Sequence, residues 1–379
     1  MSVDSAGFDC DVLVVGAGFA GLACARSLAL RGLRTRVIDR RPHPGHAVHT
    51  TGLLVKEVAE RWDVPARLTR RVRGVRLYSP NLKQLDLHAP GYYFLATDTA
   101  ALMTWFAEEA RRAGARVDFG RAYRGARRCG GGFELADSPL RTRFLIGADG
   151  PRSAVARNSG LSSNRAFLLG VEAEYEGVRG VDPDRLHCFV DYTLARGYIG
   201  WAVSGVHGIT QIGLALTRPL RPDLSAFERK LAPLFDFSQA RRIGHRGGLI
   251  PCGGRVARFA AQRVALVGDA AGLVSPLTGG GIHTALESGW RAAHAVADWL
   301  QDGGPEPAHA LAASYPRFVW KRALRRIADV AWPNAIFDAA LSTRLARRAA
   351  DAIYFHRRGS GDVEDDSTSR RAAEEAGNR

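Results

Sequence analysis

The sequence lacks the features that would place it in a membrane or outside the cell. No apolar run of about 18 or more residues occurs, so we expect no transmembrane helix. The N-terminus has no basic segment followed by an apolar one, so a secretory signal is not expected. The five cysteines are scattered and form no CxxC pair, which argues against a disulfide framework or a zinc site. We therefore expect a cytoplasmic protein that holds no metal.

Lysine is also scarce, although the formal net charge is +15. Only four of the 53 basic residues are lysines, and arginine supplies the rest. Such arginine dominance, beside abundant alanine and glycine, is typical of a GC-rich coding bias. No basic stripe interleaved with stacking aromatic side chains occurs, so we expect no nucleic-acid partner. The charge leaves open an attraction to anionic lipid headgroups or phosphorylated substrates, and with it a peripheral location at a membrane.

Glycine, in contrast, is abundant, and three glycine-rich segments carry most of the information in the sequence. These are VVGAGFAG at 14–21, GADGPRSAVAR at 147–157 and GDAAGLVSPLTGGGI at 268–282. The first follows an apolar run typical of a strand buried on both faces, Asp11–Val15. A helix over Ala20–Leu30 and a second strand over Arg36–Asp39 complete a βαβ unit of the length expected for a dinucleotide-binding fold.

The residue types in the first segment fit the phosphates and ribose of a dinucleotide. Gly16 permits the tight turn from strand to helix, Gly18 lets the backbone approach a pyrophosphate, and Gly21 lets the helix pack closely on the strand. The carboxylate of Asp39 ends the second strand, where it can bind a ribose. The contacts that we expect here are Gly16, Gly18, Phe19, Ala20, Gly21, Asp39 and Arg40.

The third segment distinguishes FAD from NAD. Asp269 follows a buried strand at Arg263–Val267, where its carboxylate can accept hydrogen bonds from the ribityl hydroxyls of a flavin. A glycine-dense turn then leads into a helix expected over Gly281–Leu300, whose first amides can face the flavin N1–C2=O edge and stabilise its negative charge. The expected contacts are Gly268, Asp269, Gly280, Gly281 and Ile282. We therefore predict bound FAD and a redox enzyme.

GADGPRS together with GDAAGLVSPLTGGGI resembles the flavin monooxygenase superfamily, which is p-hydroxybenzoate hydroxylase-like. With GGLIPCGGRV at 247–256 added, the resemblance is closest to the geranylgeranyl reductase branch, and it covers roughly residues 9–300. It implies an α/β fold: a Rossmann-like FAD-binding domain of the glutathione-reductase type with an inserted antiparallel β-sheet substrate domain. It also implies that Asp149 contacts FAD. From the residues alone, Asp149 could equally brace its own turn through Ser153 or Arg157.

The chain departs from that branch at three places. Of an aromatic motif typical of the substrate sheet, only Trp201 is present. A cysteine found in some members is absent from residues 46–52, and Asp98 and Thr99 stand where relatives usually have an arginine. These departures bear on the polyprenyl substrate more than on the flavin.

The pattern of segments predicts a discontinuous layout. Apolar and polar residues alternate over 165–217, as expected of an antiparallel sheet with one ligand-facing side. A second FAD-domain helix is expected over Ala100–Ala113. We expect residues 1–70, 98–160 and 250–300 to form the FAD-binding domain, 71–97 and 161–249 the substrate domain, 301–357 a C-terminal helical segment and 358–379 a disordered tail. Ile336–Phe355 is either a helix packed on the core or a helix on a membrane surface.

Reduced FAD supports two chemistries, hydride transfer and oxygen transfer. The resemblance favours a reductase that transfers hydride to a C=C bond of a hydrophobic, isoprenoid-like substrate. The alternatives are a monooxygenase that acts on a small hydrophobic or aromatic metabolite, and a flavin-binding protein without turnover. Alkene reduction needs a proton donor, for which His46, His49 and His283 are candidates, and Thr50, Trp201 and Cys252 are candidates for the substrate pocket. No second GxGxxG occurs, so NADPH would bind transiently, or an electron-transfer partner would supply the electrons.

Overall fold

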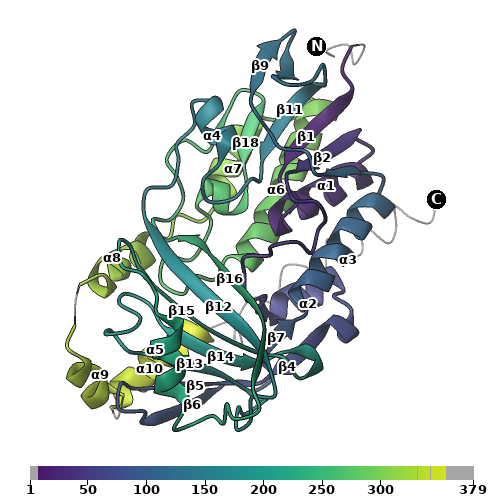
Figure 1. Ribbon diagram of the computed structural model, residues 1–379. Coiled ribbons are helices and arrows are strands. Elements are labelled where there is room, and N and C mark those ends of the chain that lie inside the picture. Colours follow the sequence, from purple (N-terminus) through teal and green to yellow (C-terminus); the bar gives the residue numbers. More distant parts are fainter. Residues whose placement is uncertain (1–6, 331, 342, 356–379) are drawn as a thin grey trace.

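The computed structural model describes residues 7–330, 332–341 and 343–355 of the chain. Within these residues the chain forms an eight-stranded, a seven-stranded and a three-stranded sheet. The two large sheets lie at opposite ends of an elongated molecule (Figure 1). The expected tail at 358–379 lies outside the described residues.

The eight-stranded sheet has a parallel core, as the βαβ pattern predicts. Every residue of its central strand β1 (Cys10–Val15) is buried, because helices cover the sheet. The order across the sheet is β17 (Ala260–Ala261), β18 (Val264–Leu266), β11 (Arg141–Gly147), β1, β2 (Thr35–Asp39) and β8 (Arg116–Phe119), with the hairpin of β9 (Ala126–Cys129) and β10 (Gly132–Leu135) joined to β11. Among the six strands from β17 to β8, only β17 is antiparallel to its neighbour.

Helix α1 (Phe19–Leu30) packs against both α3 (Thr99–Arg112) and α6 (Ile282–Gln301). Gly289 allows α6 to approach α1 closely, because any side chain at this position would overlap the carbonyl oxygen of Ala20. Two helices that are far apart in the sequence therefore meet beside the first glycine-rich turn. The short helix α4 (Ala154–Asn158) follows the second glycine-rich segment.

The seven-stranded sheet forms the other end of the molecule. Its order is β16 (Arg241–Pro251), β12 (Phe167–Glu176), β15 (Thr210–Thr217), β14 (Gly200–Ser204), β13 (Arg185–Phe189), β5 (Gly74–Tyr78) and β6 (Gln84–His88). The sheet is antiparallel as expected, except that β13 and β5 are parallel. That pairing differs from the expectation because β5 comes from a segment of the chain that lies well before β12 to β16. Helix α5 (Leu224–Leu231) covers one face through Phe227 and Leu231.

A small sheet joins the two ends. It contains β3 (Leu54–Val55), β7 (Phe94–Thr97) and β4 (Thr69–Val72), and α2 (Lys56–Trp62) follows β3. Leu54 packs in the core beneath the eight-stranded sheet, and Phe94 packs in the core of the seven-stranded sheet. The small sheet thus shares side chains with both cores.

The C-terminal segment is helical, as expected, but the region Ile336–Phe355 forms two helices and not one. The helices of this segment are α7 (Pro307–Ser314), α8 (Val319–Ala328), α9 (Asn334–Ala340) and α10 (Arg344–Tyr354). Between α9 and α10 the Thr343 hydroxyl donates to the Ala340 carbonyl at 2.7 Å, a bond that competes with helical pairing. Ala350 and Phe355 are buried against the seven-stranded sheet, so α10 packs on the core. No helix in the described part of the chain is long and apolar enough to cross a membrane.

Candidate flavin and substrate site

The first glycine-rich turn is closed on one side and open on the other. Gly16 has a φ of +105°, and a side chain there would overlap the Ala148 carbonyl, so the first and second glycine-rich segments touch. A side chain at Gly21 would overlap the carbonyl of Gly16. At Gly18, in contrast, a Cβ would meet nothing within 4 Å, and no side chain caps helix α1. Open space in front of an uncapped helix N-terminus fits a pyrophosphate.

Asp39 lies buried at the end of β2, beside this turn. Its Oδ2 accepts a hydrogen bond from the Ala17 amide at 2.7 Å, and its Oδ1 accepts one from the Arg41 amide at 2.8 Å. Burial acts to raise the pKa of the carboxyl, but the hydrogen bonds and charge of Arg41 outweigh it and hold the pKa below 3.8. The guanidinium of Arg41 also donates to the Ala17 carbonyl at 2.9 Å. Sequence reasoning chose its exposed neighbour Arg40 and missed Arg41.

Asp149 combines a structural contact with an unused oxygen. Its Oδ2 accepts hydrogen bonds from the amides of Ala154 and Val155 at 2.6 and 3.1 Å. It therefore braces the turn through the backbone, and neither Ser153 nor Arg157 is involved. Its Oδ1 is buried without a hydrogen-bond partner among the described residues. The buried hydroxyl of Tyr123 is unpaired too, and burial together with the charge of Asp149 raises its pKa to about 12. Two unpaired polar atoms in one region fit a polar ligand.

The third segment places a second carboxylate at a helix N-terminus. The half-buried Asp269 side chain receives no hydrogen bond from the described residues, and desolvation raises the pKa of its carboxyl to about 6. A Cβ on Gly281 would lie 3.6 Å from its Oδ1, so the carboxylate adjoins the glycine turn. Helix α6 begins at Ile282 without a side-chain cap. A free acceptor beside free helical amides fits the hydroxyl groups and the electron-rich ring edge of a flavin.

An apolar wall from the seven-stranded sheet reaches this glycine turn. Tyr198 makes the contact: its hydroxyl donates to the Thr278 carbonyl, and a Cβ at Gly279 would lie 2.5 Å from the hydroxyl oxygen of Tyr198. Its ring centroid lies 6.5 Å from that of Trp201. The other members of the wall are Leu168, Ala215, Ile250 and Cys252. The predicted pocket residues Trp201 and Cys252 therefore lie together, and Tyr198 was missed.

Trp201 also takes part in a buried polar network. Its Nε1 donates to the buried Glu172 carboxylate at 2.7 Å, and Arg246 Nε donates to the same carboxylate at 2.7 Å. The Thr51 hydroxyl donates to Glu172 at 2.5 Å and so fastens the loop at 46–52 to the sheet. Among the described residues the contact of Thr50 is local, since its hydroxyl accepts from the Gly52 amide at 3.4 Å. The alternation in VEAEYEG was the signal that could have identified Glu172, because it places the glutamates on one face of β12.

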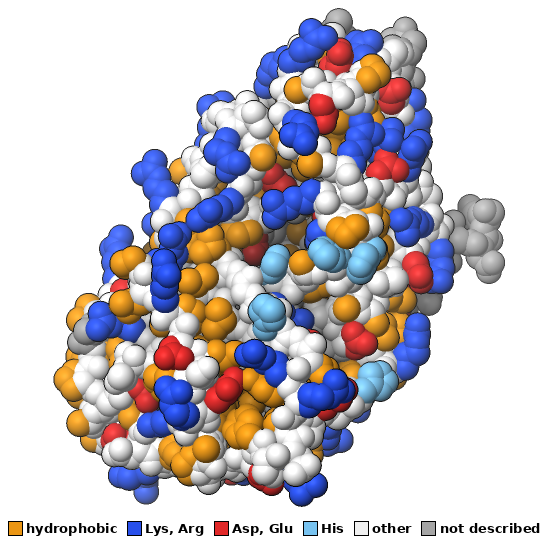
Figure 2. Space-filling view, viewed as in Figure 1, with side chains coloured by type: hydrophobic (Ala, Val, Ile, Leu, Met, Phe, Trp, Pro, Cys, Tyr) orange, Lys and Arg blue, Asp and Glu red, His pale blue; other side chains and the backbone are white. Residues whose placement is uncertain are grey.

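The same loop carries two of the predicted histidines. A Cβ at Gly248 would lie 3.2 Å from the Cβ of His49, so His49 lies over strand β16. His49 is itself exposed, and partial desolvation together with the charges of nearby arginines lowers the pKa of its imidazole below 6.5, although a hydrogen bond with the Gly247 backbone acts to raise it. His46 is exposed and its ring lies 5.4 Å from that of His43, while His283 lies in the first turn of α6. Figure 2 shows histidines around a hollow between the two ends of the molecule.

Asp98 and Thr99 have structural roles where the resemblance implies an arginine. The Asp98 side chain caps α3 by accepting from the Ala101 amide at 3.1 Å. The hydroxyl of Thr99 donates to the Thr51 carbonyl at 3.3 Å and so holds the loop at 46–52 in place. In the described part of the chain, no three His, Cys, Asp or Glu side chains are grouped to hold a metal ion.

Residues 9–318 match a family of FAD binding domains, and the chain belongs to this family. The protein is therefore an FAD-dependent oxidoreductase. Within the family it belongs to the geranylgeranyl reductase-like branch. Digeranylgeranylglycerophospholipid reductase 1 of Methanothermobacter thermautotrophicus is 30% identical over 322 residues, which cover 77% of this chain and 78% of the relative.

Two solved structures show the breadth of the fold. A geranylgeranyl bacteriochlorophyll reductase-like protein from Thermoplasma acidophilum is 22% identical, has a TM-score of 0.79, and covers 91% of this chain and 96% of its own. The p-nitrophenol 4-monooxygenase of Pseudomonas putida is 17% identical, has a TM-score of 0.66, and covers 90% of this chain and 96% of its own. At these identities the likeness shows the fold alone.

Proposed function

We propose that the protein reduces a C=C bond of a hydrophobic, isoprenoid substrate. FAD, when bound and reduced, supplies the hydride. One alkene carbon gains this hydride and the other gains a proton, which leaves the flavin oxidised. The observation that carries the proposal is the contact of Tyr198 with the Thr278 carbonyl, which joins an apolar wall to the glycine turn at the cofactor. The curated relative is named for a digeranylgeranyl glycerophospholipid, a substrate of the same chemical class.

The residues proposed to hold the cofactor come from all three glycine-rich segments. The assignment is supported by the open face at Gly18, and by Oδ1 of Asp149 and the carboxylate of Asp269, to which no described residue donates a hydrogen bond. The proposed contacts are Gly16, Gly18, Phe19, Ala20, Gly21, Asp39, Arg40, Asp149, Gly268, Asp269, Gly280, Gly281 and Ile282, to which the structure adds Arg41 as a further candidate.

We propose His49 as the proton donor, because it lies over β16 next to the network that holds Trp201. His46 and His283 are the other candidates. Thr50, Trp201 and Cys252 are proposed to line the substrate pocket, with Tyr198 beside them. NADPH or an electron-transfer partner is proposed to supply the electrons, and the enzyme is proposed to act from the cytoplasm at a lipid surface.

The proposal is tested by following one substrate in the absence and presence of air. The flavoprotein is reduced anaerobically with dithionite, and a phospholipid with unsaturated isoprenoid chains is added. We expect a product that is heavier by two hydrogens, detected by mass spectrometry, together with reappearance of the oxidised flavin spectrum. A product that gains one oxygen atom, and only after air is admitted, would identify a monooxygenase instead. If the bound flavin becomes reduced but no substrate is converted, the result would favour a flavin-binding protein without turnover.

A further inference from the structure

The apolar wall and helix α10 share one face of the seven-stranded sheet. Cross-strand pairing places a row of residues on this face, running from β15 through β14 and β13 to β5: Gly213, Trp201, Cys188 and Leu77. Helix α10 packs on the part of the face that β13, β5 and β6 form (Figure 1). Trp201 packs with the wall on one side and with the core beneath α10 on the other. The wall and the helix therefore meet at the Trp201 indole.

Tyr354, the last residue of α10, borders the wall. Its hydroxyl donates a hydrogen bond to the thiol of Cys188, which lies opposite Trp201 in the row. Desolvation, followed by the proximity of Cys188, raises the pKa of Tyr354 well above its usual value. The next residue, Phe355, is buried, and its ring centroid lies 5.8 Å from that of Tyr92. The end of α10 is therefore fixed on the sheet by two neighbouring aromatic side chains.

Polar groups bound the wall in the direction of the strands. At one end the Tyr198 hydroxyl contacts the Thr278 carbonyl of the glycine turn. At the other end the Glu172 carboxylate accepts hydrogen bonds from Trp201 and Arg246. An isoprenoid chain offers no hydrogen bond to these groups, so it lies favourably on the apolar residues between them. The favourable path for such a chain is therefore across the strands.

Across the strands, the wall extends from β16 to β14. Strand β16 is an edge strand of the sheet, whereas α10 packs on the strands beyond β14. Neighbouring strands lie about 4.8 Å apart, so the three steps from Ile250 on β16 to Trp201 on β14 span about 14 Å. An extended geranylgeranyl chain is longer than this, because each of its roughly 15 backbone bonds adds about 1.25 Å. A chain of that length, laid from the β16 edge, reaches Tyr354.

We propose that Tyr354 limits the length of the isoprenoid chain that the apolar wall accepts. The inference rests on the proposed reductase function, because it concerns the substrate of that same site. A chain that passes Trp201 has to displace the Tyr354 ring and its hydrogen bond to Cys188, whereas a shorter chain ends before them. Tyr354 is thus a specificity-determining residue, and it takes no part in the transfer of hydride or proton.

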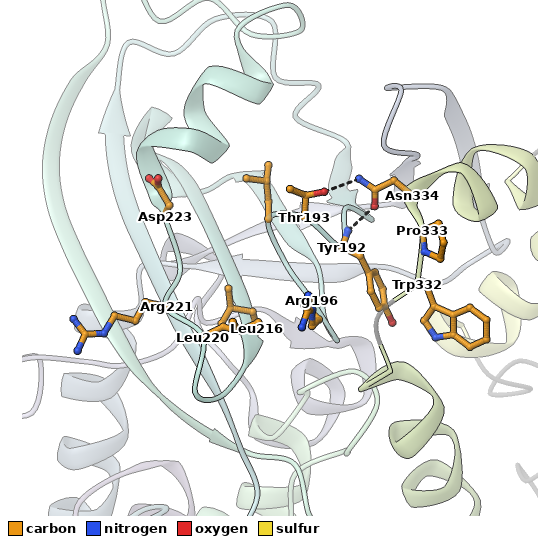
Figure 3. Close-up of a pocket in the computed structure, with 11 residues that line it drawn as sticks. Tyr192, Thr193, Arg196, Leu216, Leu220, Arg221, Asp223, Trp332, Pro333 and Asn334 are labelled. Carbon is orange, nitrogen blue, oxygen red and sulfur yellow. Dashed lines mark hydrogen bonds between the residues drawn. The ribbon is translucent and has the colours of Figure 1, made fainter.

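The hollow beside α9 offers no second end for the chain. It has a volume of about 430 Å³ and lies between residues 332–334 and the loops that follow β13 and β15 (Figure 3). Leu216 lines the hollow, whereas its neighbour Ala215 belongs to the wall, and consecutive residues of a strand point to opposite faces. The hollow therefore opens on the other face of the sheet.

The length limit is tested by binding, without turnover. Oxidised, flavin-bearing protein is titrated with geraniol, farnesol and geranylgeraniol carried by cyclodextrin, and the bound alcohol is measured by mass spectrometry after rapid gel filtration. In the wild type we expect the affinity to rise from geraniol to farnesol and then to level off. Tyr354→Ala should bind geranylgeraniol about tenfold more tightly than the wild type does, with the affinity for geraniol unchanged.

Two further variants and one control sharpen this test. Tyr354→Phe keeps the ring and should keep the limit, and Tyr354→Leu is a milder truncation that should relax it. Phe237→Ala is the matched control, because Phe237 is a half-buried aromatic residue that packs in the core on the opposite face of the same sheet. It should change the affinity for none of the alcohols. If Tyr354→Ala loses its flavin, Tyr354→Leu decides by the same criteria.

Each result supports or overturns the inference. A folded, flavin-bearing Tyr354→Ala with the wild-type order of affinities overturns it, and so does an equal change for all the alcohols, which marks a structural role. A wild type that binds none of the alcohols, or whose affinity keeps rising to geranylgeraniol, overturns it as well. Bound alcohols that gain no hydrogen after anaerobic reduction of the flavin would reject the reductase proposal and leave the length limit intact.

Discussion

At the scale of single residues, the carboxylates of the proposed flavin site differ in whether protein groups already donate hydrogen bonds to them. Asp39 is held by Arg41 and the Ala17 amide, and its pKa is lowered. Asp269 has no such donors among the described residues, and its pKa is raised to about 6 by burial. A buried carboxylate without donors costs stability in its charged form, and a ligand that offers hydroxyl groups removes this cost.

Asp269→Ala should lower the affinity for FAD by about 10- to 100-fold, because a hydrogen-bond acceptor for the ligand is lost. The measurement is equilibrium flavin binding by absorbance or fluorescence. Glu108→Ala is the control, since Glu108 forms an exposed ion pair with Arg112 at 3.7 Å on the surface of α3. Flavin retention by Asp269→Ala at wild-type affinity would contradict the assignment.

The same residue predicts a pH effect in flavin-free protein. A carboxyl whose pKa is raised from 3.8 to about 6 favours the folded state when it is protonated, and this contribution is lost as the pH rises toward 6. Asp269→Asn should therefore raise the free energy of unfolding by about 1–2 kcal/mol at pH 7 and by less at pH 5. Urea denaturation at both pH values checks this expectation.

His49 predicts the pH dependence of turnover. A proton donor must be protonated, and partial desolvation together with nearby arginines lowers the pKa of His49 below 6.5. Turnover limited by proton transfer should therefore fall as the pH rises through a value below 6.5. His49→Gln should remove this limb of the profile, whereas His43→Gln, a change three residues before the loop at 46–52, should keep it. An unaltered profile in His49→Gln would assign the donor elsewhere.

Glu172 predicts the stability of the loop that carries the histidines. Its carboxylate joins Thr51, Trp201 and Arg246, so Glu172→Gln weakens a buried ion pair and should destabilise the protein by about 2–3 kcal/mol. Glu176→Gln on the same strand breaks only an exposed pair with Arg241 and should cost less than about 0.5 kcal/mol. Chemical denaturation compares the two variants directly.

At the scale of elements, the glycines divide into those that pack and those that leave room. Gly289→Ala should push α6 away from α1 and destabilise the protein by about 2 kcal/mol, because its Cβ would overlap the Ala20 carbonyl. Gly18→Ala should leave stability unchanged and weaken FAD binding, because its Cβ enters the open space before α1. Thermal unfolding and flavin titration of both variants separate the two roles. If the two variants changed stability and FAD affinity equally, the assignment of one glycine to packing and the other to the cofactor would be contradicted.

Local patterns predicted the helices beside the cofactor well. The ranges expected for α1, α3 and α6 agree with the structure to within one residue at each end, because apolar periodicity and bounding glycines are local signals. Contacts that depend on distant segments were not predictable. The parallel pairing of β13 with β5, the reach of Tyr198 to Thr278 and the outward apolar side of α8 all depend on how the chain returns on itself. The residues of α8 have helical spacing, but spacing does not reveal which side faces solvent.

At the scale of the whole molecule, the cofactor is expected to hold distant segments together. The three glycine-rich segments are separated by more than a hundred residues each, and their turns meet at one edge of the eight-stranded sheet. Saturation with FAD at about 100 times its dissociation constant should therefore stabilise the fold by about 2.7 kcal/mol. Comparison of the melting temperature of flavin-free and reconstituted protein measures this effect. A melting temperature that does not change with flavin concentration would contradict it.

Tyr198 joins the two ends of the molecule, since it lies in the loop just before β14 of the seven-stranded sheet and its hydroxyl donates to the Thr278 carbonyl in the glycine turn before α6. A shift in the position of the glycine turn is therefore expected to shift the apolar wall that contains Tyr198. We therefore predict that the two ligands bind in sequence, cofactor first, because a cofactor at the turn would fix the position of the proposed substrate wall. Flavin binding in the absence of substrate should therefore change the fluorescence of the Trp201 indole, whose ring centroid lies 6.5 Å from that of Tyr198.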